Sequence, residues 1–99
     1  MAKHINAGEI VRRLQSGEEV NIIDVRERLE VLTGKIRGAK HIPLGLLALR
    51  KNELEKDKTY IVTCQSGNRS KAACGLLEAL GFKAENMVGG MNSWSGEIE

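Results

Sequence analysis

Short apolar segments with the pattern of β-strands alternate along this chain with segments of helical spacing, and this alternation most constrains its fold. The strand-like segments are mostly apolar and bounded by turn residues, and they comprise residues 20–25, 40–43, 60–63 and 84–88. The helical segments are one between Asn6 and Gly17, residues 44–54, residues 70–80, and a short final helix that follows Gly89-Gly90 and carries Trp94. Strands that alternate with helices predict an α/β fold, here a small parallel sheet with helices on both faces.

Several residues mark where the predicted helices begin and end. Asn6 followed by Glu9 is a capping-box pattern, in which Asn6 accepts hydrogen bonds from amides of the first helical turn. Gly17 and Gly81 follow the last apolar positions of two helices, where glycine commonly ends a helix.

Length and composition fit a single domain, residues 1–99. With 41% apolar and 28% charged residues, the chain has the composition of an ordinary soluble protein. Its apolar stretches are too short for a membrane span, and its first residues lack the pattern of a signal peptide. We therefore expect a cytoplasmic protein, and a monomer because no exposed apolar stripe is evident. A net charge of +2 favours neither nucleic acid nor a membrane as partner.

The segment after the third predicted strand contains the clearest candidate for chemistry. It consists of Cys64, Gln65, Ser66, Gly67, Asn68, Arg69 and Ser70. In parallel sheets ligands bind beyond the carboxyl ends of the strands, which is where this segment lies. Amides of a glycine-containing loop, the start of a helix and the charge of Arg69 all favour an anion there. The same groups predict a lowered pKa for the Cys64 thiol, whose thiolate would be a nucleophile. The competing interpretation is a structural cysteine at the end of a core strand.

Other residues that could carry chemistry have plainer interpretations. Cys74 lies among small residues in the middle of a predicted helix, and we expect it to be structural. Asp24 and Arg26 follow a buried strand and are interpreted as a structural ion pair or a cap. His41 lies within a strand pattern and is interpreted as structural, and Trp94 as a plug at the edge of the core.

The pattern Cys-x-x-Gly-x-Arg-Ser at residues 64–70 resembles the active-site loop of rhodanese-like sulfurtransferases in their single-domain form. Residues 23–27 and 34–44 resemble two further segments of that family, in the same order. Gly81-Phe82, then Gly89-Gly90-Met91 with Trp94, resemble its final segment. One departure is Lys35, where the family often has histidine. The resemblance extends over nearly the whole chain.

This resemblance implies a thiosulfate sulfurtransferase of the rhodanese type. Cys64 would take a sulfur atom from a donor such as thiosulfate or a persulfide. It would then pass the sulfur to cyanide or a thiol, including a protein thiol such as thioredoxin. Catalysis would fall to Cys64 and Arg69, and substrate binding to Gln65, Ser66, Gly67, Asn68, Arg69 and Ser70. The sequence contains no metal-ligand cluster or nucleotide loop, so we predict neither a metal nor another cofactor. The physiological donor and acceptor stay open.

Three alternatives compete with sulfur transfer. Cysteine phosphatases, and similar arsenate reductases, have one residue more between cysteine and arginine than the four that separate Cys64 from Arg69. The shorter loop favours a sulfur atom over a phosphoryl group. A non-catalytic sulfur-binding or regulatory module would generally lack the cysteine, which is present. A redox sensor would need Cys74 as resolving thiol, and we expect that residue to be poorly accessible.

Overall fold

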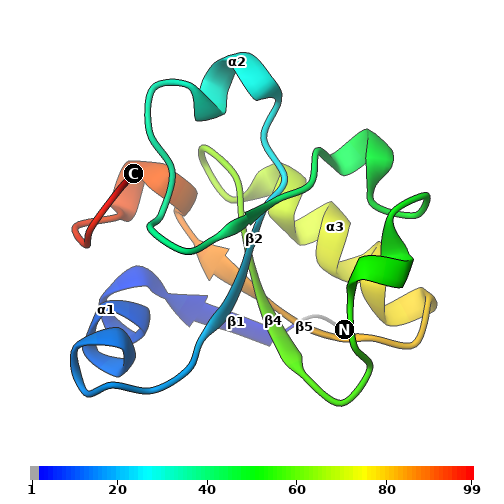
Figure 1. The fold of residues 1–99 in the computed structure, drawn as a ribbon, viewed down its shortest axis with the longest axis horizontal. Helices are drawn as coiled ribbons and strands as arrows, with labels where there is room; N and C mark the ends of the chain where they lie inside the picture. Colours follow the sequence, from blue (N-terminus) through cyan, green and yellow to red (C-terminus); the bar gives the residue numbers. More distant parts are fainter. Residues whose placement is uncertain (1–2) are drawn as a thin grey trace.

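A computed structural model describes residues 3–99, and its centre is a sheet of parallel strands (Figure 1). The strands are β1 (Lys3–Asn6), β2 (Asn21–Asp24), β3 (Lys40–His41), β4 (Thr59–Thr63) and β5 (Lys83–Val88). They form a five-stranded sheet in the order β1-β5-β4-β2-β3, with every neighbouring pair parallel. The predicted α/β fold with a parallel sheet is confirmed, and β4 is its central strand.

Helical segments connect the strands and cover both faces of the sheet. The α-helices are α1 (Ala7–Gln15), α2 (Arg28–Val31) and α3 (Asn68–Ala79), and the 3₁₀ helices are η1 (Leu44–Leu46), η2 (Lys51–Glu53) and η3 (Gly90–Ser93). Within residues 3–99, none of these helices has the length and apolar character that crossing a membrane requires.

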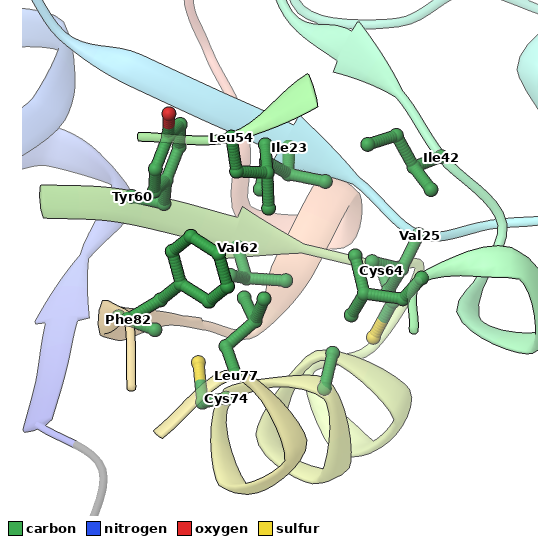
Figure 2. Packing of buried hydrophobic residues seen from close by; sticks show 13 residues of the cluster. Ile23, Val25, Ile42, Leu54, Tyr60, Val62, Cys64, Cys74, Leu77 and Phe82 are labelled. Carbon is green, nitrogen blue, oxygen red and sulfur yellow. The ribbon is translucent and has the colours of Figure 1, made fainter. Parts of the chain in front are cut away.

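The core consists of two apolar clusters, one on each face of the sheet. Ile22 of β2 and Ile61 of β4 belong to the cluster that includes Ile10 of α1. Ile23 and Val62, their neighbours along the same strands, belong to the cluster with residues of α3, which Figure 2 shows packed against the sheet. Because side chains alternate along a strand, a run of consecutive apolar residues supplies both clusters, as is typical of a doubly covered parallel sheet.

The predicted helix boundaries hold at the glycines and at the Asn6 cap. The Oδ1 atom of Asn6 accepts the amide of Glu9 at 2.8 Å. Gly17 and Gly81 follow α1 and α3 with φ values of +85° and +93°, in the left-handed region that favours glycine.

The prediction of one helix over residues 44–54 is wrong. The structure has η1 and η2 there, joined by turns. Only Leu47 and Leu54 of its leucines are buried, while Leu49 is 79% exposed, so no continuous helical face packs on the core. The amide of Leu44 donates to the carbonyl of Val25, which ties the start of this segment to the end of β2.

Three further elements differ from the sequence prediction. Strand β1 was not predicted, because Ile5 is its only buried residue and its composition gives no strand signal. Its backbone pairing with β5 holds it in the sheet. Helix α2 was not predicted because its 4 residues bury no side chain and show no periodicity. Trp94 lies directly after η3, where it packs partly buried against the cluster on the α1 face.

Candidate active site

Cys64 lies directly after β4, at the carboxyl end of the central strand, and is 1% exposed. Its Sγ atom accepts the amide of Gly67 at 3.0 Å and lies 3.3 Å from Oγ of Ser70. The residues from Cys64 to Ser70 therefore curl around the sulfur and lead into the first turn of α3. Ser66 and Asn68 are exposed on the outer side of this loop.

The loop hydrogen bonds stabilise the ionised form of Cys64. Burial alone raises the pKa of the Cys64 thiol. Hydrogen bonds from the hydroxyl and amide of Ser70, and from the amides of Gly67 and Ser66, lower it by more, so the pKa lies below its usual value. The thiolate is the nucleophilic form of cysteine, so this loop favours the reactive state.

Ser70 links the sulfur to β5 through Asn86. The Ser70 hydroxyl donates to Oδ1 of Asn86 at 2.5 Å, while the Cys64 thiol donates to Oγ of Ser70. A hydroxyl carries one proton, so on ionisation of Cys64 that proton must turn from Asn86 to donate to the sulfur. Sequence reasoning missed Asn86, because Glu85 beside it is polar as well and nothing in the strand pattern singles Asn86 out.

We expect Ser70→Ala to shift the alkylation of Cys64 to higher pH. The substitution removes a hydrogen bond to the thiolate, so the pKa of Cys64 rises and less thiolate is present at neutral pH. A hydrogen bond to a charged group contributes about 1.5–3 kcal/mol, so kcat/KM for sulfur transfer should fall about ten- to a hundredfold. The measurement is iodoacetamide alkylation against pH, beside steady-state kinetics. Ser66→Ala is the control, because its amide stays in place; an equal shift in both variants would contradict the role of the Ser70 hydroxyl.

The backbone after β5 holds the loop from the other side. The amide of Met91 donates to the carbonyl of Cys64 at 2.8 Å, and that of Asn92 donates to the carbonyl of Gln65 at 3.0 Å. These contacts turn the loop carbonyls away from the sulfur and leave its amides facing inward. Gly90, with φ +56°, makes the approach possible, since a Cβ there would lie 2.3 Å from the Cys64 carbonyl oxygen.

Asp24 and Arg26 form the structural ion pair that the sequence predicts, and this pair is buried next to the loop of residues 64–70. They are 0% and 2% exposed, and Nη2 of Arg26 lies 2.8 Å from Oδ2 of Asp24. Nη1 of Arg26 also donates to Oε1 of Gln65 at 3.1 Å. Nε2 of Gln65 donates to Oδ1 of Asn92 at 2.6 Å, so the Gln65 side chain braces the loop against two neighbouring segments.

His41 and Cys74 also have the structural surroundings expected of them. Nε2 of His41 lies 2.7 Å from the carbonyl oxygen of Arg26, which fixes the imidazole at the start of the α2 segment. Burial raises the pKa of Cys74 to about 12, so this thiol stays protonated and unreactive at neutral pH. Figure 2 shows its sulfur on α3, inside the core near Phe82 and apart from the sulfur of Cys64, which follows β4.

Arg69 pairs with a carboxylate that sequence reasoning missed. Its Nη1 and Nη2 atoms donate to the two oxygens of Glu30, on α2, at 2.6 and 2.7 Å. The hydrogen bonds to Arg69 lower the pKa of Glu30 to about 2. The pair is partly exposed at the mouth of the loop. A role of Arg69 toward substrate stays a prediction.

The family described as "Rhodanese-like domain" matches residues 6–97 of the chain. This chain belongs to the rhodanese-like domain family. Its relatives include "Putative sulfurtransferase YtwF" of Bacillus subtilis, 41% identical over 98% of this chain and 94% of that protein. A "Sulfurtransferase" of Allochromatium vinosum is 32% identical over 96% of this chain and 90% of its own.

Solved structures of rhodanese-like domains have the same fold. A rhodanese-like domain protein from Staphylococcus aureus superposes with a TM-score of 0.93 and is 36% identical, covering 98% of this chain and 96% of its own. The predicted family and fold are thereby confirmed, and sulfur transfer is the activity that the family supports.

Proposed function

We propose that this rhodanese-like domain moves a sulfane sulfur from a donor such as thiosulfate, through a persulfide on Cys64, to a thiol or cyanide. The observation that carries this proposal is the Cys64 sulfur, held by the amide of Gly67 and the hydroxyl of Ser70 at the start of α3. The hydrogen bonds of the loop lower the pKa of the Cys64 thiol and so favour the thiolate, which is the nucleophile.

The first step breaks the bond between the two sulfur atoms of thiosulfate. The Cys64 thiolate attacks the outer sulfur, and sulfite departs with the electron pair of the broken bond. Sulfite is a stable anion, so its departure requires no general acid. The product is the Cys64 persulfide anion, for which inward-facing amides and the N-terminus of α3 are suitable partners.

In the second step an acceptor nucleophile attacks the outer sulfur of that persulfide. Cyanide yields thiocyanate, and a thiolate yields a new persulfide, while the electron pair of the broken S–S bond returns to Cys64 as thiolate. A protein thiol such as that of thioredoxin fits this step, since Ser66 and Asn68 expose the outer side of the loop to solvent. We propose that the domain works as a monomer on these substrates.

Phosphoryl or arsenate chemistry is a poorer match to the same loop. Cysteine phosphatases hold the phosphoryl group with the arginine of the loop, whereas the guanidinium of Arg69 here binds the Glu30 carboxylate. The loop is also one residue shorter, which removes one amide donor. We expect negligible activity on aryl phosphates.

The test is intact mass spectrometry after incubation with thiosulfate, followed by peptide mapping. We expect one added sulfur atom per chain, removable by reductant and located on the peptide that contains Cys64. Cys74 lies in a separate peptide after tryptic cleavage at Lys71 and serves as the internal control. No added sulfur, or sulfur on Cys74 alone, would overturn the proposal.

A further inference from the structure

Arg69 carries the positive charge within the loop of residues 64–70, and a carboxylate binds the edge of its guanidinium that an anionic donor would use. Glu30 accepts hydrogen bonds from both terminal nitrogens of Arg69. These two nitrogens form a bidentate donor pair that could otherwise bind a sulfonate or phosphate group. The side chains of Arg69 and Glu30 are 38% and 33% exposed, so the pair borders the solvent from which substrate arrives.

Glu30 is held in place independently of Arg69. Its Oε1 atom also accepts the amide of Glu27 at 2.9 Å, as part of the capping box that starts α2. The pKa of Glu30, lowered to about 2 mainly by its hydrogen bonds to Arg69, keeps the carboxylate ionised at every physiological pH. The Glu30 carboxylate is therefore a fixed negative charge beside the loop, where the pair with Arg69 is partly exposed.

Arg26, the other arginine in contact with the loop, is neutralised in the same way. Its ion pair with Asp24 is buried, and its remaining contacts include Oε1 of Gln65. Each arginine beside the loop thus has its own carboxylate. Of the two arginines and the backbone amides of the loop, this leaves the amides to attract a donor anion, and their partial charges suit one negative charge better than two.

We propose that Glu30 is a specificity-determining residue of this site, whose carboxylate disfavours dianionic sulfur donors such as thiosulfate relative to monoanionic donors such as persulfides and thiosulfonates. The inference rests on the proposed sulfur transfer through Cys64 and names the substrate class of that same site.

A comparison of thiosulfate with methanethiosulfonate as donors separates the effect of donor charge from the effect of the reaction itself. In both, the Cys64 thiolate attacks a sulfane sulfur bound to a sulfonyl sulfur, and the electron pair leaves with sulfite or with methanesulfinate. The bond that breaks is the same, and the two donors differ by one negative charge and one methyl group. The ratio of their kcat/KM values therefore reports how the site responds to charge.

Glu30→Gln removes the charge of Glu30 and keeps an oxygen that can accept from Arg69 and from the amide of Glu27. We expect the kcat/KM ratio of thiosulfate to methanethiosulfonate to rise about three- to tenfold, the size of one unit-charge interaction over about 4 Å with the dielectric constant of bulk water. Both donors are assayed with cyanide as acceptor, by thiocyanate formation, at one ionic strength.

Glu53→Gln is the matched control. Glu53 also pairs with an arginine, Arg50, and its pKa is likewise lowered to about 2, but it lies on η2. It changes the net charge of the protein equally, and we expect it to leave the ratio unchanged.

The outcomes separate this inference from the proposed function. If Glu30→Gln lowers kcat/KM for both donors by the same factor, Glu30 is only structural, and the inference is overturned. An equal rise of the ratio in Glu53→Gln would assign the effect to net charge and overturn it too. If neither donor yields a Cys64 persulfide in the unmodified protein, the proposed function itself fails and the inference falls with it.

Discussion

Replacing Cys64 with serine is expected to abolish sulfur transfer while leaving the fold intact. Serine is nearly isosteric with cysteine and can keep the hydrogen bonds to Gly67 and Ser70, but its hydroxyl is scarcely ionised at neutral pH. Loss of an essential nucleophile lowers kcat by at least about ten-thousandfold in comparable enzymes. The measurement is thiocyanate formation from thiosulfate and cyanide, with circular dichroism to verify the fold.

Cys74→Ala is the control for this prediction. Cys74 is fully buried, and burial raises its pKa to about 12, so its thiol takes no part in the chemistry described above. We expect the variant to retain most of its turnover per folded molecule, with some loss of stability from the cavity. If Cys74→Ala were as inactive as Cys64→Ser, a relay between two cysteines would replace the mechanism proposed here.

The loop of residues 64–70 could be predicted from the sequence because its geometry is local. A buried strand, a glycine and a helix start within a few residues dictate where the amides point, and Cys64 lies among them. The contacts that tune this loop are not local. Glu30 meets Arg69 across 39 positions of the sequence and Asn86 meets Ser70 across 16, so no spacing rule finds either pair.

Contacts between residues far apart in the sequence also explain the errors in the predicted fold. Buried strands such as β2 and β4 carry their own signal, a run of β-branched residues that must bury both faces. Strand β1 carries almost none and is defined by its partner β5. Residues 44–54 have the composition of a helix, yet they form η1, η2 and turns, and the amide of Leu44 is bound to the carbonyl of Val25 after β2, a contact that no local pattern predicts.

Removing one charge of the Asp24–Arg26 pair is expected to have the largest effect on stability. In Asp24→Asn the size and shape of the side chain are kept, but Arg26, 2% exposed, loses the carboxylate that compensates its charge. An uncompensated buried charge costs about 3–5 kcal/mol, so the free energy of unfolding in urea should fall by that amount.

Glu97→Gln is the matched control, because it removes one carboxylate from an ion pair with Arg37 whose side chains are 76% and 71% exposed. An exposed pair contributes at most about 1 kcal/mol, so this variant should unfold nearly as the unmodified protein does. The double variant Asp24→Asn with Arg26→Met should recover part of the loss, since it leaves no buried charge behind. If Asp24→Asn cost no more than Glu97→Gln, Arg26 would draw its compensation from its hydrogen bonds to Gly34 and Gln65 instead, and the loop would rest on those neutral contacts.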